Sequence, residues 1–299
     1  MEFSMVAREW YVLNESKWCT KVALDVGRQI QNDINPFIGG DDIAEIRPKQ
    51  ILPILRAKAH ATHKVKRILQ YINRIFAYAV ACEYCEINPA RELSPVLPPH
   101  KTKGHAFINF SELPAFFSAM RADGRMSETT EAAFWIIFYT AKRRSEVVRA
   151  EWSEFDLAKA MWRIPAERMK TKREHLCPLS TQAIEVLKKQ RLRAPDSKYV
   201  FASDFRSVDR PISAWMVWNA IQDAGYKGRM TVHGTRNIFS TYAHESGLWS
   251  IDAVELQLAH IVPGVRGVYN HGKYIAERAK LVQWWADEVD ITRGIAQNE

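Results

Sequence analysis

AAFWIIFYTAKRRSE, residues 132–146, changes from an apolar run to a charged run within a few positions. Residues 134–138, FWIIF, contain no polar side chain at all. A helix that is apolar on every side is normally buried, so this run predicts a helix at the centre of a domain core. The basic residues that follow, with Arg143 among them, then lie at the end of a firmly held element. Residues in such a place are good candidates for a function.

The composition is that of a basic globular protein. Of 299 residues, 47% are hydrophobic and 25% are charged, and the formal net charge is +8. An excess of positive charge favours a polyanionic partner, most often nucleic acid. A chain of this length usually forms more than one core, so we expect two domains.

The chain shows no sign of a membrane or secreted location. No apolar run is long enough to span a bilayer, and the N-terminus lacks the pattern of a signal peptide. The four cysteines are too sparse for a disulfide framework and indicate a reducing, cytoplasmic compartment. Cys82 and Cys85 form a Cys-x-x-Cys pair, but no second pair follows at zinc-site spacing. We therefore expect structural cysteines and no metal.

Helical spacing dominates residues 1–94. Apolar residues recur every three or four positions from about Thr62 to Glu86, which predicts one long helix. Asn35-Pro36 and Gly39-Gly40 predict breaks in an earlier helix, and Pro48 is placed to begin another.

Residues 95–106 are expected to be a linker. This segment is rich in proline and charge and has no periodicity, as is typical of semi-rigid spacers. The second domain would then comprise residues 107–299. The predicted fold class is mainly α, with a small β-sheet in the second domain.

Local signals place several elements of the second domain. Ser111 is a candidate N-cap for a helix, and Ser180 or Thr181 for a later one. Residues 161–164 and 175–179 have the character of short strands, with a polar loop between them.

Residues 275–290 form an amphipathic segment near the C-terminus. Ala279, Val282, Trp285 and Val289 can share one face of a helix. Such a helix can pack on its own domain or on another subunit.

A dispersed set of polar residues carries the functional signal: Arg143, Lys170, His233, Arg236, His260 and Tyr269. Arginine binds two phosphate oxygens with its planar fork, and together with histidine donors it can neutralise charge building on a phosphate. A lysine can protonate a leaving oxygen, and a tyrosine hydroxyl can attack phosphorus. Such a set can cut a DNA strand without metal or nucleotide, so we expect no cofactor.

The segments around these residues resemble the tyrosine recombinases, the phage integrase family. TAKRRSEV, residues 140–147, is similar to the first catalytic box of that family, and MKTKREHLCPL, residues 169–179, to its lysine-bearing β-hairpin. HGTRNIFST, residues 233–241, resembles the His-x-x-Arg box. LQLAH, residues 256–260, followed by Tyr269, resembles the final box. The helical N-terminal part resembles the core-binding domain of such enzymes.

The resemblance implies a role for each residue. The ligands of the scissile phosphate would be Arg143, His233, Arg236 and His260. Lys170 would be the general acid and Tyr269 the nucleophile, while Glu146 would orient the cationic cluster. Two neighbours compete for these roles: Lys172 with Lys170, and Tyr274 with Tyr269. The spacing within the boxes favours Lys170 and Tyr269.

Further basic residues are candidates for contacts with the DNA backbone: Lys64, Lys66, Arg67, Lys172 and Arg173. The first three lie near the start of the long N-terminal helix, where a solvated helix face is the alternative. With two domains joined by a linker, a clamp that grips opposite sides of a duplex is the favoured interpretation.

The resemblance also implies the partners. The substrate would be double-stranded DNA at the core of a recombination site, in the cytoplasm or nucleoid of a bacterial or phage-infected cell. Four protomers would assemble on DNA from free monomers, with DNA-bending or directionality factors as accessories. In this family the segment after the tyrosine commonly docks on a neighbouring subunit. The chain starts at the part that resembles the core-binding domain, so an N-terminal arm-binding domain is expected to be lacking.

The sequence leaves two other functions open. A type IB topoisomerase would use the same chemistry without a partner duplex, and a decayed relative would bind DNA without cutting it. The helical N-terminal part and the filled catalytic positions favour an active recombinase that integrates or excises a mobile element through a 3′-phosphotyrosine.

Overall fold

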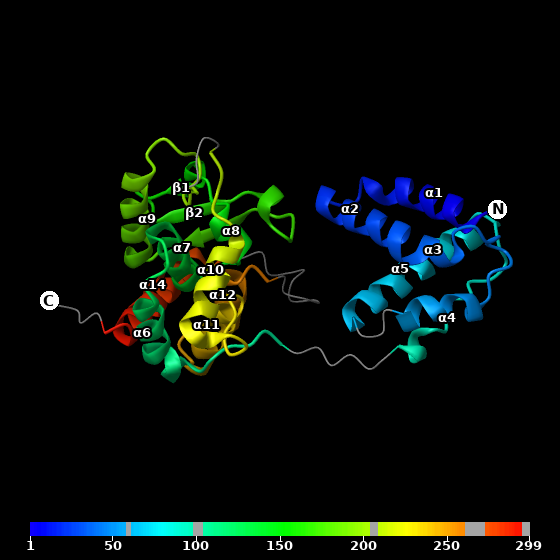
Figure 1. The fold of residues 1–299 in the computed structure, drawn as a ribbon. Coiled ribbons are helices and arrows are strands. Elements are labelled where there is room, and N and C mark those ends of the chain that lie inside the picture. The colour runs from blue at the N-terminus through cyan, green and yellow to red at the C-terminus, as the bar shows by residue number, and fades with distance from the viewer. Residues whose placement is uncertain (58–60, 98–103, 204–208, 261–272, 295–299) are drawn as a thin grey trace. The chain divides into compact units, whose positions relative to one another are not determined.

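The computed structural model describes residues 1–57, 61–97, 104–203, 209–260 and 273–294. The chain divides into two compact units, residues 1–102 and 103–299, each with its own hydrophobic core (Figure 1). No helix in the described ranges has both the length and the apolar character that a bilayer span needs.

The first unit is all helical. Its elements are α1 (Phe3–Glu15), α2 (Thr20–Gln29), the π-helix η1 (Ile30–Ile34), α3 (Asn35–Ile38), α4 (Pro48–Ala57), α5 (Thr62–Ala81) and the 3-10 turn η2 (Ser94–Val96). The buried stripe of α5 packs against α1, where the rings of Phe3 and Phe76 lie 5.7 Å apart. The helix begins at Thr62 as predicted but ends sooner, because Glu83 adopts a left-handed backbone with φ 60°.

The prediction of a break at Asn35-Pro36 is wrong. The chain continues from α2 through the π-helical turn into α3, and Pro36 lies in the first turn of that helix. A proline is tolerated there because its missing N–H would have no partner within the helix. The turn away from the helix comes at Gly39. Pro48 begins α4 as predicted.

The second unit combines helices with one small sheet. Its elements are η3 (Phe110–Glu112), α6 (Leu113–Asp123), α7 (Glu128–Thr140), α8 (Arg144–Val148), η4 (Trp152–Glu154), β1 (Phe155–Asp156), β2 (Met161–Ile164), η5 (Ala166–Arg168), β3 (His175–Pro178), α9 (Thr181–Arg193), α10 (Ala214–Ile221), η6 (Gln222–Tyr226), α11 (Gly234–Glu245), α12 (Ile251–Gln257) and α14 (Ile275–Thr292).

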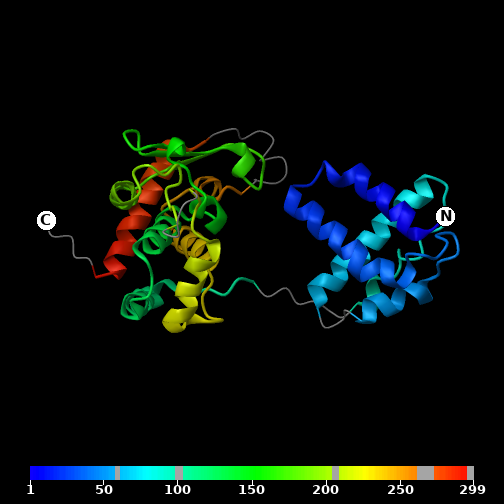
Figure 2. The ribbon, with the colours of Figure 1, turned by 45° about the horizontal axis from the view of Figure 1, so that its top comes forward.

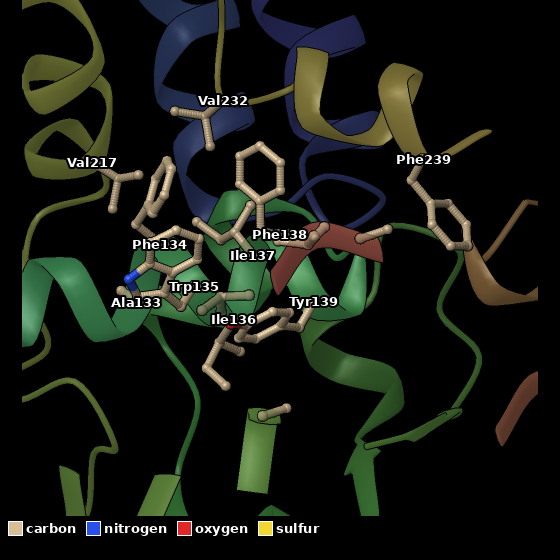
Figure 3. Packing of buried hydrophobic residues seen from close by; sticks show 14 of the residues in the cluster. Ala133, Phe134, Trp135, Ile136, Ile137, Phe138, Tyr139, Val217, Val232 and Phe239 are labelled. Atoms are coloured by element: carbon tan, nitrogen blue, oxygen red, sulfur yellow. The ribbon is translucent and has the colours of Figure 1, made fainter. Parts of the chain in front are cut away.

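Helix α7 is the centre of this unit, as its apolar sequence predicts. Every residue from Thr129 to Thr140 is buried except Glu131. Figure 3 shows Val217, Val232 and Phe239, from later elements, on one side of the α7 side chains. The Ser127 side chain caps the start of the helix, and Ala141 ends it with a left-handed backbone. The basic residues that follow are thereby fixed to the most buried helix of the unit.

The three strands form an antiparallel sheet in the order β1-β2-β3. The register pairs Trp162 with Phe155 on one side and with Cys177 on the other. The strands β2 and β3 were predicted, whereas β1 was not, because two residues are too few to show a pattern. Ser180 caps α9 as one of the two predicted candidates. Ser111 does not cap a helix. Asn109 is the N-cap residue of η3, and its backbone amide donates to the Glu112 carboxylate at 3.0 Å.

The C-terminal helix α14 packs on its own domain, against α6, α7, α12 and β3 (Figures 1 and 2). Trp285 is fully buried and donates from Nε1 to the Phe138 carbonyl at 2.7 Å. Val282 and Val289 lie on the buried face as predicted, but Ala279 is exposed and Arg278 is buried in its place. The predicted stripe therefore fails only at its first position, where polar acceptors of β3 and α12 receive the arginine.

Candidate active site

The turn between α7 and α8 positions Arg143. Ala141 has φ 52° and turns the chain out of α7, and Arg143 then occupies the N-cap of α8 with an extended backbone. Glu146, three residues on, accepts hydrogen bonds from the Arg143 amide and from its Nη1, both at 2.9 Å. Glu146 is 2% exposed and the Arg143 side chain 22%. The carboxylate thus holds the arginine in place and leaves part of it open.

The start of α11 supplies His233 and Arg236. Gly234 permits a close approach here, because a Cβ at this position would lie 2.5 Å from the Ala106 carbonyl oxygen. Arg236 is 3% exposed and donates to the carbonyls of Ala141 at 2.6 Å and Leu258 at 2.7 Å. Ala141 and Leu258 are the C-cap residues of α7 and α12, so the guanidinium binds at two helix C-termini, where the helix dipoles favour a positive charge.

His260 is joined to this group through both ring nitrogens. Its Nε2 lies 3.1 Å from Arg236 Nη2, and its Nδ1 lies 2.8 Å from a Glu255 carboxylate oxygen. Arginine can only donate, so Nε2 accepts and Nδ1 carries the proton. Glu255 was not identified from the sequence. Its separation from His260 carries no recognisable signal, because the helix end between them brings them together.

An open cavity of about 430 Å³ lies beside these residues. Three of the expected phosphate ligands line it: Arg143, His233 and Arg236. His105, Arg144, Trp215 and Trp218 line it as well and were not identified from the sequence. The rings of His105 and His233 are 4.3 Å apart, although His105 comes from a segment without periodicity.

The cavity has a surplus of positive charge. Burial and the neighbouring Arg143 lower the pKa of Arg236 to about 10, so this arginine remains charged. Burial, followed by His105 and the two arginines, lowers the pKa of His233 to about 4, so its ring is neutral near pH 7. Repulsion among these groups would be relieved by an anion, and a phosphate matches the fork of an arginine.

The other predicted residues lie elsewhere. Lys170, Lys172 and Arg173 are exposed on the loop between η5 and β3, and Lys170 is not among the residues that line the cavity. In the first unit, Lys66 and Arg67 are exposed on α5, whereas Lys64 forms an ion pair of 2.7 Å with Asp33.

Tyr269 falls in residues 261–272 and so lies outside the described residues. Its competitor Tyr274 stands at the N-cap of α14, with its hydroxyl 3.4 Å from an Asp252 carboxylate oxygen.

Two family comparisons together cover both units. Residues 3–95 match the phage integrase central domain, and residues 106–274 match the phage integrase family. The chain belongs to the phage integrase family. It is therefore a site-specific DNA recombinase that breaks and rejoins DNA, as its resemblance to tyrosine recombinases implied.

Relatives within the phage integrase family align along most of the chain. The prophage integrase IntZ of Escherichia coli K12 is 35% identical over 96% of this chain and 71% of its own length. The integrase of Enterobacteria phage P4 is 34% identical over 97% of this chain and 70% of its own length.

Solved integrases share the fold. Lambda integrase (residues 75–356), as a dimer bound to a COC′ core site, has a TM-score of 0.68 and 16% identity, covering 88% of this chain and 96% of that one. The Tn1549 transposon integrase in complex with a circular intermediate DNA has a TM-score of 0.72 and 13% identity, covering 87% of this chain and 92% of that one.

Proposed function

We propose that this integrase cleaves one DNA strand at a time by attack of Tyr269 on a scissile phosphate. The new bond joins the tyrosine oxygen to phosphorus, and the bond to the 5′ oxygen breaks. The products are a 3′-phosphotyrosine and a free 5′ hydroxyl. Attack by a 5′ hydroxyl from a partner duplex reverses the step and joins the strands in a new combination, with no net loss of bond energy.

The convergence of Arg143, His233 and Arg236 on one cavity is the observation that carries this proposal. The two arginines bind the non-bridging oxygens and offset the charge that grows as the tyrosine attacks. His260 would donate a further hydrogen bond to the phosphate once its Nε2 carries a proton and exchanges the contact with Arg236 for one with a phosphate oxygen. Glu146 keeps Arg143 oriented between turnovers, so little reorganisation is needed when DNA binds.

Lys170 is the proposed general acid. For this role the loop before β3 must bring its ammonium to the phosphate beside the arginines when DNA binds, where it can protonate the leaving 5′ oxygen. The exposed Lys172 and Arg173 on the same loop suit contacts with neighbouring phosphates, as do Lys66 and Arg67 on α5. Lys64 is available for such a contact if its ion pair with Asp33 opens.

The proposed working assembly is a tetramer on two recombination core sites, formed from monomers within a bacterial cell. Lambda integrase has been solved as a dimer on a core site and as a tetramer on a Holliday junction. Two successive strand exchanges would integrate or excise a mobile element, with DNA-bending or directionality proteins biasing the outcome.

Trapping on nicked DNA tests the proposal. Duplexes from the junctions of the mobile element, with a nick placed to let the 5′ product diffuse away, should accumulate a covalent adduct with the wild-type protein. Tyr269→Phe should form none, while Tyr274→Phe should still form it. An adduct that persists in Tyr269→Phe would assign the nucleophile elsewhere. Absence of an adduct in the wild type, with DNA binding intact, would mark a protein that only binds DNA.

Strand exchange separates recombinase from topoisomerase. Two labelled duplexes that carry the mapped cleavage site should yield recombinant products and a four-way junction. Relaxation of supercoils without any exchanged product would favour topoisomerase activity instead.

A further inference from the structure

We propose that Arg278 is a positioning residue for strand cleavage, which fixes the start of α14 to the end of α12 and to strand β3. This inference rests on the proposed function of Tyr269, since the two elements that Arg278 joins flank the segment that contains this residue. Arg278 is not one of the proposed catalytic residues, and its side chain does not line the cavity.

Arg278 is buried in the first turns of α14, with 3% of its surface exposed. Its Nε and Nη2 donate to Gln257 Oε1 at 3.1 and 2.9 Å, and Nη2 also donates to the Leu176 carbonyl at 2.6 Å. Nη1 donates to the Lys273 carbonyl at 3.3 Å. The guanidinium therefore contacts three separate pieces of chain: the last turn of α12, strand β3 and the residues just before α14.

Gln257 extends this connection to the cavity. It is fully buried, and its Nε2 donates to the Thr140 carbonyl at 2.9 Å, at the end of α7. The Gln257 backbone carbonyl accepts from Nζ of Lys142, and Lys142 is the residue before Arg143. Lys142 is fully buried too and lies 2.7 Å from His175 Nε2 on β3. A continuous set of buried hydrogen bonds thus runs from α14 to the turn that positions Arg143.

The charge of Arg278 is difficult to explain by stability alone. Within the described ranges, every atom to which it is hydrogen-bonded is a carbonyl, an amide oxygen or the neutral His175 ring at 3.3 Å. Burial of a cation without a carboxylate partner is costly, and apolar side chains often replace buried ions with a gain in stability. A planar guanidinium does, however, join several acceptors in one fixed geometry, which neither lysine nor an apolar side chain can do.

The contact between Gln257 and Arg278 joins the end of α12 to the start of α14, and Tyr269 stands between these two elements in the sequence. Through Gln257 and Lys142, the same contact supports the turn that holds Arg143. Loss of the arginine fork would then shift the phosphate-binding groups relative to the nucleophile. A displacement of about 1 Å of a reacting group can cost about 100-fold in rate. We therefore expect loss of the arginine fork to slow the chemical step about 10- to 100-fold, with little change in DNA affinity.

The test compares Arg278, near the start of α14, with Arg293, the C-cap residue of the same helix, in the full-length chain. Arg278→Lys keeps the charge but loses the fork. Arg293→Lys is the matched control, because Arg293 packs on the Trp135 ring at 3.6 Å and pairs with Asp290 at 3.0 Å at the far end of α14. Both variants are mixed in excess with a nicked duplex containing the cleavage site mapped for the wild type, and adduct formation is followed in a single turnover. The dissociation constant for the same duplex is measured alongside.

Rate and amplitude separate positioning from simple destabilisation. A misfolded fraction lowers the amplitude of adduct formation, whereas misplacement of the reacting groups lowers the rate constant at saturating protein. We expect a rate constant about 10- to 100-fold lower for Arg278→Lys, with a dissociation constant near that of the wild type, and an unchanged rate constant for Arg293→Lys.

Three outcomes would count against the inference. A wild-type rate constant in Arg278→Lys overturns it alone, as does an equal slowing in Arg293→Lys. No adduct with the wild-type protein overturns the proposed function and this inference together. If Arg278→Lys does not fold, Gln257→Met removes the shared acceptor, and the same rate comparison with Arg293→Lys applies.

Discussion

Glu146 holds Arg143 by two hydrogen bonds, one from the backbone amide and one from the guanidinium, each to a different carboxylate oxygen at 2.9 Å. The hydrogen bond from the backbone amide stabilises the start of helix α8, and the hydrogen bond from the guanidinium orients the cavity-lining arginine. One buried carboxylate therefore serves the local fold and the site together. This pairing provides the first of five predictions.

Replacement of Glu146 by glutamine should slow cleavage about 10- to 100-fold, since a hydrogen bond to a charged group contributes about 1.5–3 kcal/mol. The amide places an NH₂ group where one of the two carboxylate oxygens accepts, so it cannot keep both hydrogen bonds in their present geometry, and it lacks the negative charge. Single-turnover adduct formation measures the effect, and Glu151→Gln serves as a control because Glu151 pairs with Lys198 and neither residue lines the cavity. Equal rates in both variants would contradict a special role for Glu146.

His233 should titrate well below an ordinary histidine in the free protein, because burial and neighbouring cations lower its pKa to about 4. The neutral ring is thus the main form at pH 7, and it would charge only as the pH falls toward 4. Arg143→Gln should raise this pKa by removing one of the repelling charges, and bound DNA should raise it further. NMR titration of the ring protons measures the value. A pKa that does not respond to Arg143→Gln would show that the two groups do not interact.

Because of Lys142, the free energy of unfolding should rise with pH above neutrality. Burial lowers its folded pKa to about 7 from 10.5, so between these values the unfolded chain binds more protons than the folded one. Stability then increases with pH over this window, by up to about 1.4 kcal/mol per pH unit, and the contribution is flat below it. Chemical denaturation from pH 6 to 10 measures the slope for wild type and Lys142→Met. The variant should lack this component, and identical slopes would refute the assignment.

Alanine variants of Lys170 and Lys172 should differ in whether a modified substrate restores DNA cleavage. Lys170→Ala should lose most cleavage, and a substrate with sulfur in place of the 5′ bridging oxygen should recover it, because a thiolate leaves without a proton. Lys172→Ala should instead weaken DNA binding and reduce its salt dependence. Adduct yields on the two substrates and binding at several salt concentrations decide between them. Rescue of Lys172→Ala instead of Lys170→Ala would exchange the roles.

Ala141→Gly should stabilise the second domain by about 1 kcal/mol. Ala141 has φ 52°, a left-handed backbone that costs a non-glycine residue about 1–2 kcal/mol. The control is Ala133→Gly within α7, which should destabilise by about 1 kcal/mol because glycine is a poor helix former. Thermal unfolding of both variants tests the pair. Destabilisation by both would show that the turn at Ala141 is unstrained.

Much of the candidate site follows from local sequence. The apolar run of α7 predicts a buried helix, and Arg143 follows it directly. The family resemblance brings in His233, Arg236 and His260, and the structure places the first two in the same cavity as Arg143 and the third against Arg236. Lys170 remains a prediction on an exposed loop, and Tyr269 remains one outside the described residues.

The errors arise where a local rule meets a tertiary contact. Ser111 has the right chemistry for a cap, but Asn109 lies where the chain enters the helix. Pro36 suggests a break, but the π-helical turn before it leaves proline in a tolerated place. Ala279 fits an apolar stripe, but Arg278 turns inward because Gln257 and Leu176 offer acceptors there.

The sequence by itself determined the family, the mainly helical fold and the candidate residues for binding a phosphate, since these depend on periodicity and on motifs read along the chain. Only the tertiary structure decided which groups support them. Glu255 behind His260, His105 beside His233 and Arg278 between α14, α12 and β3 are partners brought together by packing. Their hydrogen bonds form between positions far apart on the chain or across a helix end, where no local pattern specifies the partner.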